Sequence, residues 1–329
     1  MNTIKKPTVS VIIPVYNVQD YICTAIDSVL SQTTAPDEII IVDDGSTDNS
    51  GALVEEKYGH ISYVKIVHTK NQGLGEARNV GTRIASGDFI YYFDSDDILN
   101  PELLSTFQIV WENNPNIDLF VFSAESFFDT VVKSTDNNAV SPPCYLRNME
   151  KTYPTGREAF NSLSRLGTFY PNAWIYMFRR AVQVENALFF KPIIHEDEEF
   201  TPRLFFKSNK TVVTNKVFFR RRVRPGSIMQ TRRSEGNIIG YIESITALSE
   251  LIKINNGESK RFLRARLRNN MLNIILILRD YDILLSPLCK KKIASIFEEH
   301  DDFLMKIARR NVFLFRCVRY FFRRVGVYL

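Results

Sequence analysis

The chain has 329 residues, of which 45% are hydrophobic, 24% charged and 12% aromatic, with 14 Gly, 13 Pro and four Cys. This composition excludes disordered, collagen-like and disulfide-dependent small proteins, and the length suits one large domain or a domain with an extension. The net charge of +5 is uneven, because residues 1–100 hold 7 basic and 14 acidic side chains, whereas residues 203–329 hold 27 basic and 10 acidic ones.

The first hundred residues predict strands that alternate with helices. Apolar, β-branched runs indicate buried strands at 9–15, 38–42, 63–68 and 89–93. Helical spacing or composition indicates helices at 19–32, 50–58 and 75–85. Strands that alternate with helices are typical of βαβ units, so we expect an α/β fold with a largely parallel sheet flanked by helices.

The remainder of the chain predicts a second, more helical part. We expect a helix at 101–113, a strand at 118–123, an irregular insertion at 129–155, and ordered segments at 172–180, 195–200 and 211–222. From residue 235 the pattern is helical to the end. We therefore predict two parts, a domain at 1–234 and a helical extension at 235–329.

Acidic residues gather where the predicted strands end. Asp43 and Asp44 follow one strand, and Asp94, Asp96 and Asp97 follow another. In an open α/β sheet, ligands bind outside the carboxyl ends of the strands. Carboxylates packed together repel one another unless a cation compensates, and a hard divalent ion shared with substrate phosphates does so. The alternative is that these acids cap the helices that follow.

Five blocks in order resemble a known family: SVIIPVYN (10–17), EIIIVDDGSTDNS (38–50), NQGLGEARNVG (71–81), ASGDFIYYFDSDD (85–97) and HEDEEF (195–200). The sequence resembles the family 2 glycosyltransferases of the GT-A fold, of the bacterial surface-polysaccharide type. The resemblance implies a Rossmann-like nucleotide-sugar-binding domain, a UDP-sugar donor, an Mn²⁺ or Mg²⁺ cofactor and inversion at the anomeric carbon.

The resemblance also implies a role for each matching residue. Asp96, with Asp94, binds the metal ion. The donor is bound by Pro14, Tyr16, Asn17, Asp43, Asp44, Arg78, Asp94, Ser95, Asp97, Arg222, Arg224 and Ser227. The two arginines and Ser227 belong to a loop that closes over the diphosphate, for which the alternative is an exposed basic strand.

HEDEEF supplies a carboxylate outside the nucleotide site. An attacking sugar hydroxyl loses a proton, so a positioned base assists the reaction. The resemblance implies that Asp197 is this base, with Glu196 beside it, and that Trp174 stacks on the acceptor sugar. The alternatives are an acidic, solvated helix start favoured by the helix dipole and a tryptophan of the core.

The C-terminal tail and the compartment complete the expectations. Residues 306–329 hold seven basic side chains, no acid and several aromatic ones. Such a segment either contacts an anionic membrane or packs on the preceding helices. The dispersed cysteines, the interrupted N-terminal apolar run and the lack of a spanning segment predict a cytoplasmic protein, peripheral on the inner face of the membrane if the tail binds lipid.

We expect a saccharide or polyprenyl-linked saccharide as acceptor and no nucleic acid as partner, because no recognition motif accompanies the basic charge. Two other functions stay open. One is a non-catalytic sugar- or lipid-binding scaffold with the same fold. The other is a nucleotidyltransferase, which would release pyrophosphate in place of UDP.

Overall fold

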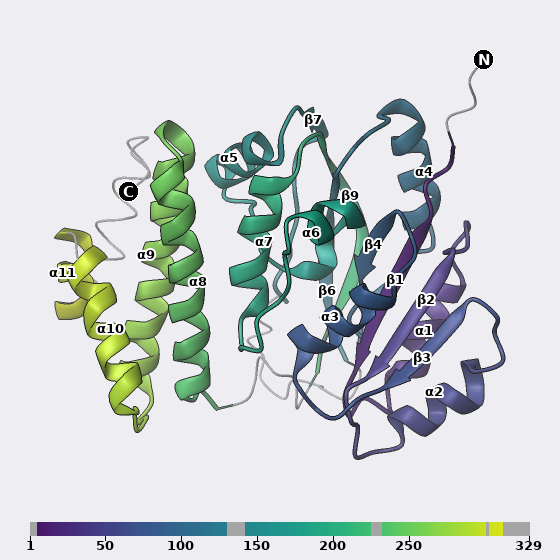
Figure 1. Cartoon of the computed structure of the whole chain (residues 1–329), viewed down its shortest axis with the longest axis horizontal. Helices are drawn as coiled ribbons and strands as arrows, with labels where there is room; N and C mark the ends of the chain where they lie inside the picture. Colours follow the sequence, from purple (N-terminus) through teal and green to yellow (C-terminus); the bar gives the residue numbers. More distant parts are fainter. Residues whose placement is uncertain (1–4, 130–141, 225–231, 301–302, 312–329) are drawn as a thin grey trace, which may run out of the picture.

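The structure, a computed structural model, describes residues 5–129, 142–224, 232–300 and 303–311. A central sheet has helices on both faces, and the C-terminal helices stack beyond α7 on one side (Figure 1). The helices are α1 (Ile22–Leu30), α2 (Ser50–Tyr58), α3 (Leu74–Ile84), α4 (Leu103–Asn113), α5 (Gly156–Leu166), α6 (Arg180–Glu185), α7 (Glu196–Lys207), α8 (Glu235–Ile254), α9 (Gly257–Asp280), α10 (Pro287–His300) and α11 (Phe303–Arg310).

Within the described ranges, nine strands form one sheet in the order β3-β2-β1-β4-β8-β6-β9-β5, with β7 paired to β9. The strands are β1 (Val9–Val15), β2 (Glu38–Asp43), β3 (Val64–His68), β4 (Phe89–Tyr92), β5 (Ile98–Leu99), β6 (Leu119–Phe128), β7 (Lys151–Tyr153), β8 (Tyr176–Arg179) and β9 (Thr211–Val223). The pairs among β1, β2, β3 and β4 are parallel, which confirms the predicted βαβ units. Beyond β4 the sheet is mixed, because β8 runs antiparallel to both β4 and β6.

The order of the parallel strands sets the place where a ligand can bind. β2 lies on one side of β1, and β4, the fourth strand along the chain, lies on the other. Connections therefore leave β1 and β4 toward opposite sides, which opens a crevice outside their carboxyl ends. These ends lie along the lower edge of the molecule in Figure 1.

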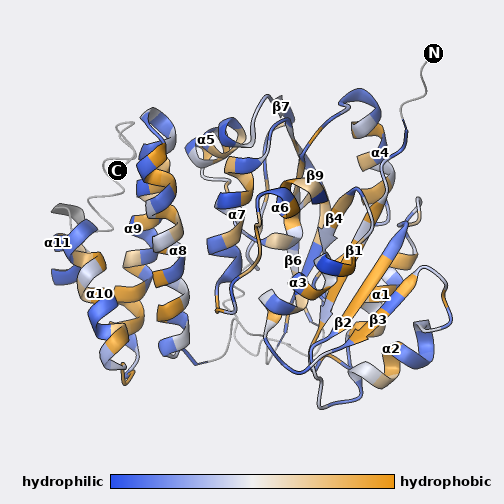
Figure 2. Cartoon of the chain, in the orientation of Figure 1, coloured by the Kyte–Doolittle hydropathy of each residue, from blue (hydrophilic) through white to orange (hydrophobic). Residues whose placement is uncertain are grey.

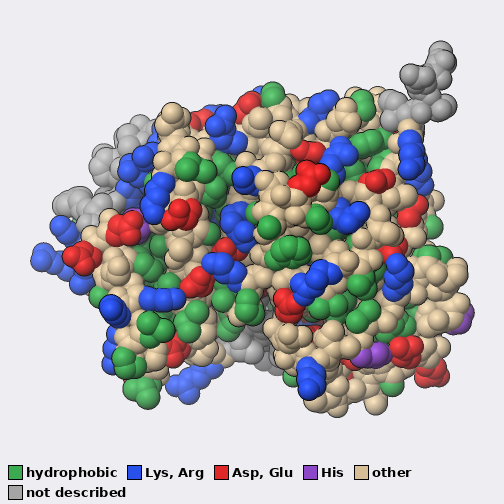
Figure 3. Space-filling view, in the orientation of Figure 1, with side chains coloured by type: hydrophobic (Ala, Val, Ile, Leu, Met, Phe, Trp, Pro, Cys, Tyr) green, Lys and Arg blue, Asp and Glu red, His purple; other side chains and the backbone are tan. Residues whose placement is uncertain are grey.

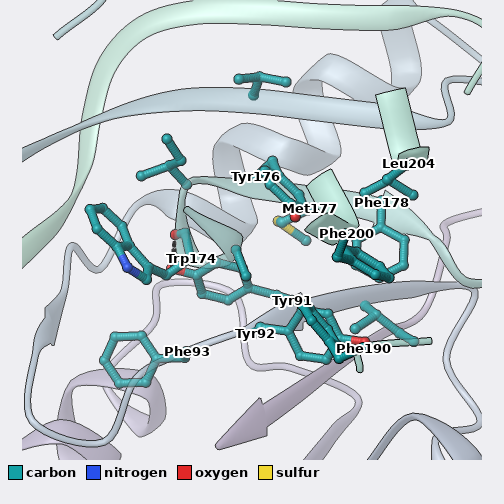
Figure 4. Close-up of a cluster of buried hydrophobic side chains, with 14 of the residues drawn as sticks. Tyr91, Tyr92, Phe93, Trp174, Tyr176, Met177, Phe178, Phe190, Phe200 and Leu204 are labelled. Carbon is teal, nitrogen blue, oxygen red and sulfur yellow. Dashed lines mark hydrogen bonds between the residues drawn. The ribbon is translucent and has the colours of Figure 1, made fainter. Parts of the chain in front are cut away.

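Hydrophobic strands and a layer of aromatic side chains form the core. β2 and β3 are largely orange in Figure 2, and every residue of β1 and β2 is buried. Tyr92 of β4 packs against Phe178 of β8, which in turn contacts Phe200 of α7 (Figure 4). Phe190 stacks on Phe200 of α7 with ring centroids 4.0 Å apart, and Tyr92 lies 5.3 Å from Phe190. This packing fixes the end of β4 relative to the start of α7.

The helical extension shares the core of the domain. α8 begins at Glu235, next to the boundary that the sequence predicts. The buried hydrophobic cluster runs without a break from β1 to Ala308 of α11. None of the helices that the structure describes is long and apolar enough to cross a membrane. Of the predicted membrane-binding tail, residues 312–329 lie outside the described part of the chain.

Candidate active site

The loop after β4 carries the acidic residues that the sequence singles out. Asp94 and Asp96 each expose 23% of the side chain, whereas Ser95 and Asp97 are 7% and 4% exposed. The loop follows the carboxyl end of β4, at the crevice beside β1. Asp94 and Asp96 are therefore the acids of this loop that a ligand can reach.

Two arginines at the end of β9 bind the same loop. Arg222 donates from its backbone N–H to Asp97 Oδ1 (2.6 Å) and from Nε to the backbone carbonyl of Asp96 (2.9 Å). Arg224 Nε donates to Asp96 Oδ2 (2.7 Å). Both guanidinium groups also lie over the ring of Tyr21. The R-x-R segment thus contacts the acidic loop directly, and its predicted closure over a diphosphate stays a prediction. Ser227 lies outside the described residues.

The loop is short of positive charge despite these contacts. Burial raises the pKa of Asp96, and the charge of Asp94 adds to this effect although Arg224 opposes it. Burial, with the charges of Asp96 and Asp94, raises the pKa of Asp97 well above its ordinary value. Additional positive charge at this loop would therefore stabilise the ionised carboxylates.

These carboxylates fit a divalent ion that is shared with a ligand. Carboxylate oxygens are the donors that Mg²⁺ and Mn²⁺ prefer, and Mg²⁺ is usually held by one or two carboxylates together with substrate phosphates. Within the described ranges, no group of three or more His, Cys, Asp or Glu side chains could hold a metal ion. Asp94 and Asp96 would therefore need the oxygens of a bound diphosphate to complete the coordination.

Arg78 joins the acidic loop to the start of α7. It is 2% exposed and donates from Nη2 to Asp94 Oδ1 (2.8 Å) and from Nη1 to Glu196 Oε1 (2.7 Å). Burial acts to lower the pKa of Arg78, but the charges of Asp94 and Glu196 outweigh it and raise that pKa. Arg78 therefore holds two parts of the site together, and its predicted contact with the nucleotide stays a prediction.

The first turn of α7 contains four acids, three of which are paired with basic side chains. Glu196 is paired with Arg78, Glu198 with Arg266 of α9, and Glu199 with Arg203 and Lys191. Among the residues that the structure describes, Asp197 is the one acid of this turn without a basic partner. Its Oδ1 accepts the backbone N–H of Glu198 at 2.8 Å.

Asp197 also differs from a solvated aspartate in its protonation. Burial raises its pKa well above the ordinary value, and the charges of Glu196 and Glu198 add to this effect, while Arg78 opposes it. A base is most effective when its pKa lies near the working pH. The turn is acidic as predicted, but Glu196 and Glu199 are buried and paired, so the alternative of a solvated helix start does not describe it.

The ends of β1 and β2 shape the other wall of the crevice. Pro14 is buried and Tyr16 is 47% exposed. Asn17 adopts a positive φ of 50°, a conformation that asparagine tolerates, and its Oδ1 accepts the backbone N–H of Thr47 at 2.8 Å. Asn17 therefore supports the loop after β2, and the exposed ring of Tyr16 is available to a ligand.

Asp43 and Asp44 support neighbouring loops in this structure. Asp43 accepts a hydrogen bond from the backbone N–H of Ser46 (3.0 Å) and is hydrogen-bonded to His68 Nδ1 (2.9 Å). Asp44 accepts the backbone N–H groups of Gln72 (2.9 Å) and Gly73 (2.8 Å), just before α3. Their contacts with a base and a ribose remain predictions.

Trp174 is 5% exposed and stacks on Phe219 with centroids 4.3 Å apart. This position agrees with the alternative of a core tryptophan, and a role toward an acceptor stays a prediction.

Tyr145, which sequence reasoning missed, packs edge-on against Trp174 at 4.9 Å. Its hydroxyl accepts a hydrogen bond from Arg221 Nη1 (3.3 Å). Burial raises the pKa of this hydroxyl, although Arg221 opposes the effect. Tyr145 therefore joins Trp174 to the end of β9 through Arg221.

The helical extension supports the start of α7, which sequence reasoning also missed. Ser244 of α8 donates to the backbone carbonyl of Glu198 at 3.0 Å. A Cβ on Gly240 would lie 1.8 Å from the carbonyl oxygen of Ile194, so α8 touches the segment before α7. Gly240 was the available signal in the sequence, because a glycine inside a predicted helix often marks a place where another backbone segment packs closely.

This geometry defines an open α/β protein, with an acidic loop at the crevice where the strand order reverses. Residues 10–184 match the sequence model of the family described as Glycosyl transferase family 2. The chain belongs to this family, as the resemblance predicted.

The relatives include the uncharacterized glycosyltransferase EpsJ of Bacillus subtilis, which is 30% identical over 226 residues. The match covers 68% of this chain and 63% of EpsJ, so the chain spans less than two thirds of that relative.

Two solved structures share the fold. TarS 1-349 of S. aureus, in complex with UDP-GlcNAc, has a TM-score of 0.65 at 21% identity, covering 97% of this chain and 92% of that one. The mannosyltransferase PcManGT of Pyrobaculum calidifontis, in complex with GDP-Man and Mn²⁺, has a TM-score of 0.52 at 14% identity, with coverages of 96% and 87%. These likenesses concern the fold alone, and they confirm the predicted GT-A architecture.

Proposed function

We propose that this protein is an inverting, metal-dependent glycosyltransferase. It transfers one sugar from a UDP-sugar to a saccharide or polyprenyl-linked saccharide during assembly of exopolysaccharide, capsule or lipopolysaccharide, on the cytoplasmic face of the membrane. The observation that carries the proposal is the junction of two acidic parts through Arg78. One part is suited to a metal-bound diphosphate, and the other presents Asp197 without a basic partner.

The reaction follows from this division of roles. The oxygen of the acceptor hydroxyl forms a bond to the anomeric carbon, and the bond from that carbon to the diphosphate breaks. UDP leaves with the electron pair, and Asp197 takes the proton of the hydroxyl. Attack from the side opposite the leaving group inverts the configuration.

The new negative charge on UDP needs neighbouring cations. Asp94 and Asp96 would hold Mn²⁺ or Mg²⁺, which neutralises the diphosphate charge when bound. Arg222 and Arg224 lie beside the same loop, and guanidinium groups suit phosphate oxygens because they bind them bidentately. Two similar folds support the nucleotide-sugar and metal proposals, since TarS was solved with UDP-GlcNAc and PcManGT with GDP-Man and Mn²⁺.

A thermal-shift screen of nucleotide sugars with and without Mn²⁺ tests the donor proposal, because a ligand that binds only the folded state raises its apparent stability. An assay of the released nucleotide then separates the three functions. UDP release in the presence of an acceptor supports glycosyl transfer, pyrophosphate release supports nucleotidyl transfer, and binding without release supports a scaffold. Absence of any shift with UDP-sugars would contradict the donor class.

A further inference from the structure

The turn between α9 and α10 exposes large apolar side chains beside a run of lysines. Leu284 is 92% exposed, Leu288 is 66% exposed and Tyr281 is 39% exposed. Lys290, Lys291 and Lys292 follow on α10 and are also exposed. We call residues 281–292 the α9–α10 tip. Single exposed apolar residues are ordinary, but three of them within eight residues of one turn are candidates for a contact surface.

The charges around the tip are mainly positive. Its one acid is Asp282, and the preceding Asp280 is paired with Arg279 at 2.6 Å. Lys292 forms an ion pair with Glu243 of α8 at 3.1 Å. Lys290 and Lys291 form no ion pair with the residues that the structure describes. Arg232 and Arg233 lie just before α8 and add to the basic surface.

Hydrogen bonds connect the tip to the candidate active site. Ser286 of the tip donates from its backbone N–H (2.9 Å) and its hydroxyl (2.6 Å) to Glu235 at the start of α8. Two residues further along α8, Asn237 Nδ2 lies 3.3 Å from Nε2 of His195, which precedes α7 and Asp197. The tip is thus fixed to the helix start that carries the candidate base.

The tip and the crevice lie on the same edge of the molecule. In Figure 1 the α9–α10 turn, the start of α8 and the carboxyl ends of β1 and β4 all lie along the lower edge. The space-filling view shows hydrophobic and basic side chains together over the lower end of the C-terminal helices (Figure 3). A flat surface that touches the tip would therefore face the opening of the crevice.

We propose that the α9–α10 tip docks this protein on an anionic phospholipid surface. Leu284 and Leu288 enter the interfacial layer, and Lys290 and Lys291 contact the phosphates of the headgroups. Apolar insertion and attraction between lysines and anionic lipid both strengthen such binding. Only the purpose of this docking rests on the proposed function: it would bring a lipid-linked acceptor to Asp197.

Co-sedimentation of the full chain with vesicles tests the proposal, using phosphatidylglycerol mixed with phosphatidylcholine against phosphatidylcholine alone. We expect binding to the anionic vesicles only. The double variant Leu284→Ser/Leu288→Ser should reduce the partition coefficient by about tenfold or more, and so should Lys290→Glu/Lys291→Glu. The matched control is Ile254→Ser, because Ile254 is 79% exposed at the opposite end of α8. Unchanged circular dichroism verifies that each variant is folded.

Three results would overturn the proposal. The first is that the wild-type chain ignores anionic vesicles. The second is that the leucine variant binds them as well as the wild type does, which would move the lipid contact to another surface such as residues 306–329. The third is that neither the wild type nor the leucine variant binds vesicles, but light scattering gives the two proteins different molecular masses. That result would make the tip a contact between copies of the chain. Donor and acceptor are absent from this assay, so its failure leaves the proposed transfer reaction untouched.

Discussion

Asp197 differs from its three acidic neighbours on α7 because it forms no ion pair with a basic side chain of the described residues. We expect Asp197→Asn to lower kcat by about 10²–10⁴-fold, since the amide cannot accept the proton of the attacking hydroxyl. The dissociation constant for the donor should stay the same, and calorimetry measures it. Glu56→Gln, an exposed change on α2, is the control. An Asp197→Asn enzyme with wild-type kcat would exclude Asp197 as the base.

The raised pKa of Asp197 predicts a particular pH profile. A base must be ionised, so kcat should fall as the pH drops through the raised pKa of Asp197, well above the ordinary aspartate value of about 3.9. This fall in kcat at low pH should be absent from the residual activity of Asp197→Asn. A kcat that stays constant down to about pH 4, where an ordinary aspartate protonates, would show that no such group acts in catalysis.

Arg78 and Arg83 lie on the same helix and offer a matched pair. Arg78→Met leaves Asp94 and Glu196 without their shared buried partner, so the free energy of unfolding should fall by about 3–5 kcal/mol. Arg83 pairs with Glu76 but exposes half of its side chain, so Arg83→Met should cost less than about 1 kcal/mol. Urea denaturation measures both changes. Equal effects of the two substitutions would contradict the structural role of Arg78.

At the scale of elements, the contact between α8 and the segment before α7 couples the extension to the site. Gly240→Ala places a methyl group against the carbonyl oxygen of Ile194, and we expect a loss of about 1–3 kcal/mol in stability together with a lower kcat. Gly236, also on α8, faces the flexible end of the Ile194 side chain, at 3.2 Å from a Cβ.

Gly236→Ala is therefore the control for Gly240→Ala, and its effect should stay within about 0.5 kcal/mol. Thermal unfolding and steady-state kinetics measure the pair. If Gly240→Ala were as harmless as Gly236→Ala, α8 would not determine the position of the helix that carries Asp197.

The elements differ in how far the sequence predicts them. β1 and β2 are fully buried and rich in Val and Ile, so their type follows directly from the pattern, and their bounds agree with it to within one residue. α5 was missed, although Thr155 accepts the backbone N–H of Glu158, a capping signal visible in the sequence. The sequence could not predict that β8 lies between β4 and β6 and runs antiparallel to both, because strand periodicity does not identify the pairing partner.

At the scale of the whole molecule, the site combines segments that are distant in the chain. The acidic loop after β4, the end of β9 and the start of α7 meet through Arg222, Arg224 and Arg78. The sequence predicted that acids gather at the end of β4, because their place after an apolar strand is visible in it. It could not predict that Arg266 pairs with Glu198, since that contact depends on the way α9 packs on α8, which itself packs on α7.

Isothermal titration of UDP into the full chain, with and without Mn²⁺, tests the central claim that Asp94 and Asp96 hold a diphosphate through a divalent ion. The account predicts that UDP binds in the presence of Mn²⁺ and that Asp96→Asn weakens this binding by about tenfold or more, which corresponds to about 1.4 kcal/mol. Circular dichroism should show an intact fold in the variant. UDP binding that is the same without Mn²⁺ and in Asp96→Asn would contradict the claim.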